Sequence, residues 1–490
     1  MRTEKSLFKN YLYNLSFQLL TIMLPVITVP YISRVLKPEG IGLYSYTFAI
    51  VSYVVLMGGL GLTLHGSRTI AISRNEEKSL KEYFWEIFIF KCFSMSLALV
   101  IYISWIFVTD PMNKELYLYQ GIGIIAALLD ITFYFNGLEE FKKIITRNLV
   151  VKLLSLVLMF LLVKDSDDIL IYIIIIQGSS LIGNLFLLTY LKKLNVFKGI
   201  NLTYLRSLNY SKHIIPAIKL FIPLAAVQIY TVLNKLMLGY FSGPTEVGYF
   251  DNAMKIITLV LTIITSLGTI MLPRASFYFS TGNLSKIKYQ INLSLKMTSI
   301  ISIGLIFGLI GINGNFVLWF FGPDFKEVQE ILPILAIAIL PISIASITMT
   351  QYLVPSGKNK VYTVSVVLGA ITNILLNLAL IPKYDAVGAA ISYLFAEAIV
   401  TSIQFIYSRA FVTIKENAKN LLMTVISGII MLIVINIILK YHNFRHDILL
   451  TFTQVAIGVP VYILVLKLLN NEMIDFLIKK IFHKRSRDTV

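Results

Sequence analysis

The chain has 490 residues, of which 57% are hydrophobic and only 14% are charged, with a formal net charge of +17 at pH 7. Soluble domains carry about 25% charged residues, so this composition excludes a soluble globular protein and indicates a protein embedded in a membrane. A single cysteine, Cys92, excludes an internal disulfide, and the five histidines lack metal-binding spacing. We therefore expect no bound metal and no cofactor.

Long apolar runs recur along the whole chain, each close to the ~20 residues that a helix needs to cross a bilayer. Fourteen such runs predict an all-α polytopic membrane protein. The run that follows the charged start "MRTEKSLFKN" is too long for a signal peptide, so it is interpreted as the first span. The expected spans are 12–33, 41–62, 83–108, 116–138, 144–163, 169–190, 215–240, 247–271, 293–312, 330–354, 361–381, 386–408, 420–440 and 448–469.

The distribution of positive charge predicts the orientation. If the N-terminus is cytoplasmic, nearly two thirds of the 43 Lys and Arg residues lie in segments that face the cytoplasm. The positive-inside rule therefore places both termini on the cytoplasmic side. This placement explains the positive net charge without nucleic acid as a partner, and it predicts that the basic end "KKIFHKRSRDTV" anchors to the membrane surface.

One turn is written twice in the sequence, as "PEGIGLY" at 38–44 and as "PTEVGYF" at 244–250. The turn itself is interpreted as structural, because Pro presets the backbone and Gly permits a tight bend. At the same offset of 206 residues a third position also matches, so that Pro38, Gly42 and Arg68 correspond to Pro244, Gly248 and Arg274. Six spans separate the copies, so both halves enter the membrane in the same direction, as in transporters with parallel repeats.

The repeat predicts four parts along the chain. Two pseudo-symmetric six-helix lobes around a central cavity would comprise residues 1–212 and 213–412. An additional transmembrane hairpin at 413–470 and a basic cytoplasmic tail at 471–490 would follow.

A family resemblance rests on three stretches of sequence. The stretch "PSGKNKVYTVSVVLGAITNILLNLALIPKYDAVGAAISYLFAE" at 355–397 contains a Gly-Lys-x-Lys turn, the pair Asn373 and Asn377, and a Gly-Ala-Ala run. It resembles the C-terminal half of bacterial polysaccharide repeat-unit flippases of the Wzx type. The segments "PYISRVLKPEGIGLYSYTFAIVSYVVLMGGLGL" and "NKLMLGYFSGPTEVGYFDNAMKI" resemble the beginnings of the two lobes in that family. Asp385 departs from the family pattern, because many relatives carry Gly there, and we expect a neighbouring residue to take the bend.

The resemblance covers residues from about 10 to 470 and implies a member of the multidrug/oligosaccharidyl-lipid/polysaccharide exporter superfamily. Such a protein would move polyprenyl-pyrophosphate-linked oligosaccharide repeat units from the cytoplasmic to the outer leaflet of a bacterial cytoplasmic membrane. It would do so by alternating access with a cationic cavity, for capsule or O-antigen synthesis. Membrane lipid, a polysaccharide polymerase and the glycosyltransferases of the same pathway are the implied partners.

Ionisable residues inside spans are costly and are therefore candidate functional residues. Lys91 lies deep in the third span and is the first candidate for a pyrophosphate contact, although it could instead pair with an acid of another helix. Asp130 and Glu397 also lie well inside spans and are candidates for ion coupling, unless each neutralises a lysine. Further head-group candidates lie near span ends, where a cation can also reach the interface: Lys219, Lys235, Arg34, Arg68 and Arg274.

Three other functions are weighed. A drug or cation antiporter of the same fold would favour acids and aromatic residues in its cavity. A membrane polymerase would need a large outer platform, whereas the longest expected outer loop is about 313–329, and no P-loop or Gly-x-Ser-x-Gly motif is present. We therefore expect a transporter rather than an enzyme. A passive scramblase would share the polar path but not the duplicated lobes.

Overall fold

The structure, a computed structural model, describes residues 4–74, 76–191, 200–441 and 447–475. The regular elements in these ranges are all helical, and the chain divides into two compact units, up to Gly239 and from Tyr240 onward. Eleven stretches of the described chain are long and apolar enough to cross a membrane. Two of them, Met23–Gly59 and Asn359–Phe411, each hold two expected spans joined by a bend, and α10 (Ile214–Phe241) covers another. The predicted all-α polytopic membrane protein is therefore confirmed.

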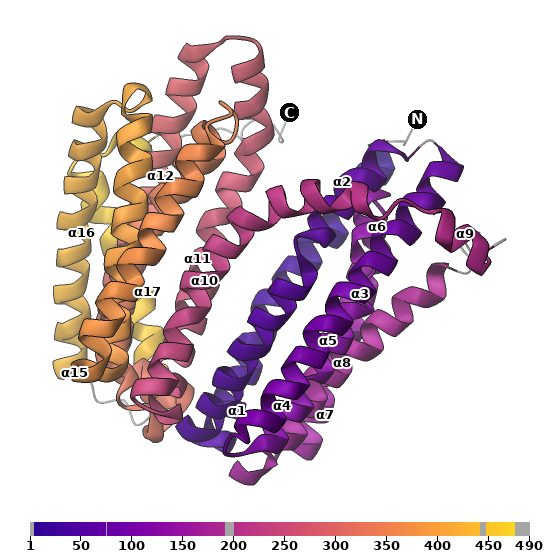
Figure 1. The fold of residues 1–490 in the computed structure, drawn as a ribbon. Helices are drawn as coiled ribbons and strands as arrows, with labels where there is room; N and C mark the ends of the chain where they lie inside the picture. The colour runs from indigo at the N-terminus through magenta and orange to yellow at the C-terminus, as the bar shows by residue number, and fades with distance from the viewer. Residues whose placement is uncertain (1–3, 75, 192–199, 442–446, 476–490) are drawn as a thin grey trace. The chain divides into compact units, whose positions relative to one another are not determined.

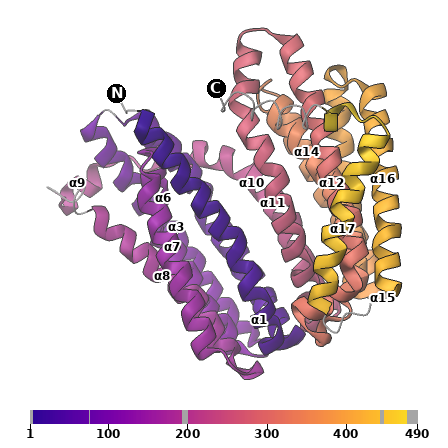
Figure 2. The ribbon, with the colours of Figure 1, turned by 180° about the vertical axis from the view of Figure 1, so that it is seen from behind.

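In the first unit the long helices α1, α3, α7 and α8 run side by side (Figures 1 and 2). The expected fourth span is not one helix, because it consists of the short helices α4, α5 and α6. The elements are α1 (Glu4–Gly59), α2 (Leu62–Ile72), α3 (Glu77–Thr109), α4 (Lys114–Gln120), α5 (Ile122–Leu128), α6 (Thr132–Gly137), α7 (Phe141–Leu162), η1 (Ser166–Asp168), α8 (Ile169–Leu191), α9 (Leu202–Ser207), η3 (Ser211–His213) and α10.

In the second unit α12 packs against α11, α13, α14, α16 and α17. The expected tenth span consists of α13, α14 and a single π turn, η5. The elements are α11 (Pro244–Ser280), α12 (Leu284–Phe321), η4 (Pro323–Phe325), α13 (Val328–Ile337), α14 (Ile339–Thr348), η5 (Met349–Leu353), α15 (Asn359–Ser408), η6 (Arg409–Phe411), α16 (Ile414–Tyr441) and α17 (Asp447–Leu468).

The turn that the sequence repeats has the same backbone conformation in both copies. Lys37, immediately before Pro38, has φ 58° and ψ 177°, and Gly243, immediately before Pro244, has φ 90° and ψ 175°. A positive φ with an extended ψ is a region that glycine occupies almost alone. The first copy therefore imposes on a lysine the conformation that the second copy gives to a glycine.

Asp385 takes the bend inside α15 itself, with φ 48° and ψ −129°. The departure from Gly therefore does not move the bend to a neighbouring residue. The register of the turn is fixed by the helices on either side of it, and Glu246 of α11 accepts a hydrogen bond from the backbone N–H of Ala386 at 3.2 Å. Displacing the bend by one residue would remove this contact.

We predict that Lys37→Gly and Asp385→Gly each stabilise the protein by about 1 kcal/mol. The relief of about 1–3 kcal/mol of backbone strain exceeds the roughly 0.5–1 kcal/mol that glycine costs through the unfolded chain. Thermal unfolding of the purified protein in detergent measures the difference. Gly243→Ala is the matched control and should destabilise, since its Cβ would have no atom within 4 Å and only the backbone opposes it. A lower melting temperature for Lys37→Gly would contradict the strain argument.

Three buried side chains bind the start of α10 to α2 and α3. His65 Nε2 lies 2.8 Å from His213 Nδ1, and His213 Nε2 lies 2.9 Å from a carboxylate oxygen of Glu86. Lys212 Nζ lies 2.8 Å from the same Glu86 oxygen that His213 contacts. The other oxygen of Glu86 accepts a hydrogen bond from the backbone N–H of Asn209 at 3.0 Å. A carboxylate only accepts, so His213 donates from Nε2, and in the neutral form of His213 its Nδ1 accepts from His65. Burial favours the neutral form of both imidazoles.

The histidines make the attachment of α10 sensitive to acid. Burial lowers the pKa of His65 from 6.5 to about 4, with His213 and Arg68 adding to the shift. Burial also lowers the pKa of His213, although Glu86 opposes this effect. At pH values between the folded pKa of His65, about 4, and its unfolded pKa, 6.5, the unfolded protein binds more protons than the folded one. The stability that these hydrogen bonds contribute is therefore complete above pH 6.5 and declines as the pH falls toward 4.

We predict that acidification from about pH 7.5 to about 5 lowers the melting temperature of the wild type more than that of His213→Gln. Glutamine can accept from His65 and donate to Glu86, but it does not titrate in this range. The lost stability is at most about 1.4 kcal/mol per pH unit for each proton. Equal pH slopes for the two proteins would show that His213 does not contribute to the pH dependence of stability.

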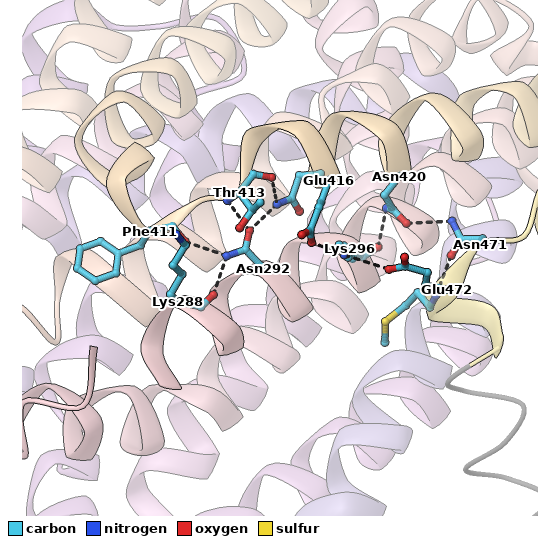
Figure 3. A network of polar contacts seen from close by, with 11 residues as sticks. Lys288, Asn292, Lys296, Phe411, Thr413, Glu416, Asn420, Asn471 and Glu472 are labelled. Carbon is cyan, nitrogen blue, oxygen red and sulfur yellow. Dashed lines mark hydrogen bonds and ion pairs between the residues drawn. The ribbon is translucent and has the colours of Figure 1, made fainter. Parts of the chain in front are cut away.

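The hairpin of α16 and α17 is joined to α12 by polar contacts, shown in Figure 3. Asn292 Nδ2 donates to the carbonyls of Lys288 and Phe411 at 2.7 and 2.8 Å. Asn292 Oδ1 accepts from the backbone N–H of Thr413 at 2.7 Å and from Asn417 Nδ2 at 2.5 Å. One buried amide thus satisfies the backbone at the point where α16 begins.

A second group of contacts, one turn further along α12, joins the first turns of α16 and the residues after α17 to that helix (Figure 3). Lys296 Nζ of α12 lies 2.8 Å from Glu416 and 3.6 Å from Glu472. Asn420 Nδ2 donates to the Lys296 carbonyl at 3.2 Å, and Asn471 Nδ2 donates to Asn420 Oδ1 at 2.9 Å. The start of α16 and the residues that follow α17 are therefore attached to the same helix. The lobe limits expected from the repeat, including the separate hairpin and tail, stay predictions.

Candidate functional site

A cavity of about 360 Å³ lies inside the first unit, between α1, α5, α6, α7, α8 and α10. Small-ligand pockets have volumes of about 300–1,000 Å³. Polar groups inside a membrane helix bundle are costly unless they serve a purpose, so this cavity is the candidate site. Asp130 and Arg147 are its charged residues among those the structure describes, and its uncharged polar residues are Ser52, Thr132, Gln177, Ser180, Asn184 and Gln228.

The fourth span breaks at the cavity, between α5 and α6, and Asp130 lies in the break. Its carboxylate accepts the backbone N–H of Thr132 at 2.9 Å and the Thr132 hydroxyl at 3.0 Å. The N–H of Tyr134 bonds to Ile131 instead of Asp130, which leaves the Asp130 carbonyl without its helical partner. A freed carbonyl inside a membrane needs a donor from another element.

Lys91 of α3 supplies that donor. Its Nζ donates to the Asp130 carbonyl at 2.7 Å and lies 3.9 Å from a carboxylate oxygen of the same residue. The Lys91 side chain is 3% exposed. The structure thus joins two residues that the sequence singled out separately, and Lys91 has an acid of another helix beside it.

Arg147 of α7 lines the cavity and was missed in the sequence. Its Nη1 donates to Asn184 Oδ1 at 3.1 Å, and Asn184 Nδ2 donates to the Ala126 carbonyl at 2.6 Å. Gly183 leaves room for the arginine, since a Cβ there would lie 3.0 Å from Arg147 Cδ. The expected span 144–163 placed Arg147 near its edge, but α7 begins at Phe141. With the correct start of α7, Arg147 would have counted as an ionisable residue inside a span and would have been a candidate.

A line of buried amides fixes the wall of the cavity. Gln177 Nε2 donates to Gln120 Oε1 at 2.6 Å, and Gln120 Nε2 donates to the Thr47 hydroxyl at 3.2 Å. Gly123 is required beside them, because a Cβ there would lie 2.6 Å from Gln177 Oε1. The Gln177 side chain is therefore held in one orientation at the cavity surface.

The other predicted residues do not line this cavity. Their exposures differ, and their proposed roles stay predictions. Glu397 is buried on α15 and Lys235 is half-buried on α10, whereas the exposed ones are Arg34 on α1, Arg68 on α2, Lys219 on α10 and Arg274 on α11.

Comparison with protein families identifies the chain. A model described as "Polysaccharide biosynthesis protein" matches residues 7–279, which is more than half of the chain. This protein belongs to that family. The model of the lipid II flippase MurJ also matches, over residues 154–459, and the resemblance to Wzx-type flippases of the exporter superfamily is confirmed.

Two known proteins are similar in sequence to this one over most of its length. A putative O-antigen transporter of Escherichia coli (strain K12) is 25% identical over 84% of this chain and 98% of its own. The capsular polysaccharide biosynthesis protein CapF of Staphylococcus aureus is 23% identical over 82% of this chain and 100% of its own. Lipid II flippase MurJ in an inward closed conformation has the same fold, with a TM-score of 0.74 at 17% identity over 95% of this chain and 100% of its own.

For this family member we predict that Lys91→Met and Asp130→Asn are coupled. Lys91→Met alone removes the cation beside a partly buried carboxylate and should cost about 3 kcal/mol. Adding Asp130→Asn removes the unpaired charge and should restore about 1–3 kcal/mol of that loss. Melting temperatures of the two single variants and the double variant measure the coupling, and additive effects would contradict it. A stable double variant without transport would show that transport needs the charged pair itself and not only the fold that it stabilises.

Proposed function

We propose that this protein is a flippase for polyprenyl-pyrophosphate-linked oligosaccharide repeat units, which it moves from the cytoplasmic to the outer leaflet. The observation that carries the proposal is the amide- and hydroxyl-lined cavity inside a bundle of membrane-spanning helices. The relatives named as an O-antigen transporter and a capsular polysaccharide protein support a cell-surface glycan as the cargo. The cell compartment that fits is the bacterial cytoplasmic membrane, with both termini on the cytoplasmic side.

The chemistry of the cargo explains why such a cavity is needed. A sugar hydroxyl that loses its hydrogen bonds on entering hydrocarbon costs several kcal/mol, whereas the polyprenyl tail is stable in lipid. Amides such as Gln177 and Asn184 offer both donors and acceptors to a hydroxylated head group. The protein therefore covers the head with polar groups while the tail stays in the bilayer.

The duplicated turn supports alternating access by two related lobes, residues 1–212 and 213–412. In this proposal the cations near span ends guide the anionic head group: Arg34, Lys219, Lys235, Arg68 and Arg274. Asp130 balances Lys91, and buried Glu397 is the candidate for ion coupling. Glycosyltransferases of the same pathway act before the flipping step, and a polymerase acts after it.

The membrane potential can supply the driving force. An anionic head group that leaves a negative cell interior gains about 2.3 kcal/mol per charge for each 100 mV. A pyrophosphate carries more than one negative charge, so export proceeds downhill without a coupled ion. Transport that continues unchanged after the potential is collapsed at fixed pH would contradict this driving force.

We predict that the purified protein in vesicles exposes a polyprenyl-pyrophosphate oligosaccharide at the outer leaflet, and that an imposed potential accelerates this exposure. Gly123→Ala should slow it several-fold, because the new Cβ displaces Gln177 from the cavity wall. Gly178→Ala is the matched control, since a Cβ there meets no atom within 4 Å.

Exposure no faster than in protein-free vesicles, for a panel of oligosaccharides, would contradict the flippase. Uptake of a cationic dye under the same conditions would instead support the drug exporter. Exposure that is insensitive to potential and equal in both directions would indicate a scramblase.

A further inference from the structure

The charges at the cavity of the first unit do not cancel. Asp130 and Arg147 are the charged groups among its described lining residues. The Asp130 carboxylate is already bound by Thr132, and Lys91 lies 3.9 Å from it. Asp130 interacts with both Lys91 and Arg147, and the three groups together carry one positive charge in excess.

Arg147 is held in place but is not saturated with hydrogen bonds. Nη1 donates to Asn184, which is itself fixed by the Ala126 carbonyl. Nε is buried and has no hydrogen-bond partner among the residues that the structure describes. Arg147 lines the cavity, and the N–H groups of Nη1 and Nη2 at the end of its guanidinium form a parallel pair that fits a carboxylate in a bidentate manner. The cavity therefore contains a preoriented donor for an oxyanion.

The uncharged part of the cavity surface suits a sugar ring. Ser52 and Ser180 donate their hydroxyl protons to the carbonyls of Phe48 and Ile176, at 2.8 and 3.2 Å. Their oxygens consequently remain as acceptors for hydroxyl groups of a ligand. Phe48 also lines the cavity and offers an aromatic surface. Acceptors beside an apolar ring are what a pyranose, with hydroxyls at its edge and C–H groups on its face, requires.

We infer that this cavity binds a carboxylate-bearing sugar of the repeat unit, with Arg147 as the residue that recognises the carboxylate. The inference rests on the proposed function and adds its substrate class. One excess positive charge matches a monoanionic carboxylate. A pyrophosphate brings more negative charge than Arg147 can neutralise. The cavity volume of about 360 Å³ suits one end of an oligosaccharide rather than a whole lipid-linked repeat unit.

The first test is a binding measurement on the full-length protein in nanodiscs, which does not require transport. The probes are a soluble disaccharide that ends in glucuronic acid, the same disaccharide ending in glucose, and inorganic pyrophosphate. We expect the wild type to bind the acidic disaccharide at least tenfold more tightly than the neutral one. Arg147→Gln should abolish that difference, and Arg147→Lys should retain part of it. Lys152→Gln removes a cation from an exposed position of the same helix and should retain all of it.

Each outcome of the binding measurement decides the inference. Equal binding of the two disaccharides by the wild type would overturn it, as would an unchanged preference in Arg147→Gln. Pyrophosphate binding that Arg147→Gln removes would assign the cavity to the carrier phosphates and would also overturn it. Melting temperatures of the variants identify any loss that is due to unfolding, and Arg147→Lys then provides the folded comparison.

A transport measurement separates this inference from the proposed function. Vesicles receive two polyprenyl-pyrophosphate disaccharides that differ only in a terminal glucuronic acid or glucose. A wild type that flips the acidic substrate faster, and an Arg147→Gln variant that flips both at the slower rate, support both ideas. If both substrates are flipped equally by the wild type, the flippase stands and the carboxylate site falls. If neither is flipped while acidic sugar binding persists, the site stands and the proposed function falls.

Discussion

The hydrogen bond from Lys91 to the carbonyl of Asp130 allows the first unit to contain a polar cavity in its apolar interior. Backbone groups inside a bilayer must be satisfied by the protein, and the break in the fourth span frees one carbonyl. Lys91 satisfies it, and the same break places the Asp130 carboxylate where it can accept from Thr132. Arg147 and Gln177, on other helices of the cavity, are oriented by their own hydrogen bonds to Asn184 and Gln120.

The two halves of the chain share a backbone plan but not this chemistry. The expected tenth span is also divided, between α13 and α14, close to the position 206 residues after the break at Asp130. At that offset Met297 corresponds to Lys91 and Ala336 to Asp130. The division of the helix therefore belongs to the repeated fold, whereas the buried ion pair is specific to the first copy.

Hydropathy predicted the spans well, because lipid selects for apolar runs that are visible in any window of the sequence. The repeated turn was also predictable, since Pro38 and Pro244 mark a fixed backbone requirement. The break beside Asp130 was not, because the apolar run continues through it and nothing local marks a lost hydrogen bond. Arg147 was missed because the start of α7 was placed three residues late. The hydrogen bonds that link His65, His213 and Glu86 could not be predicted from the sequence, because they join residues up to 148 positions apart.

The attachment of α10 bears on how the protein could be divided. The repeat assigns α10 to the second half, but the two histidines and Glu86 bind its first turn to the helices before it. Gly61 adds a close backbone contact, since a Cβ there would lie 2.8 Å from the Ala217 carbonyl. For co-expression as two complementary fragments, the polypeptide is therefore best divided in the short turn before Pro244, which follows the end of α10. A cut near residue 212 would expose buried imidazoles at a new chain end and leave the N-terminal fragment without the helix that covers them.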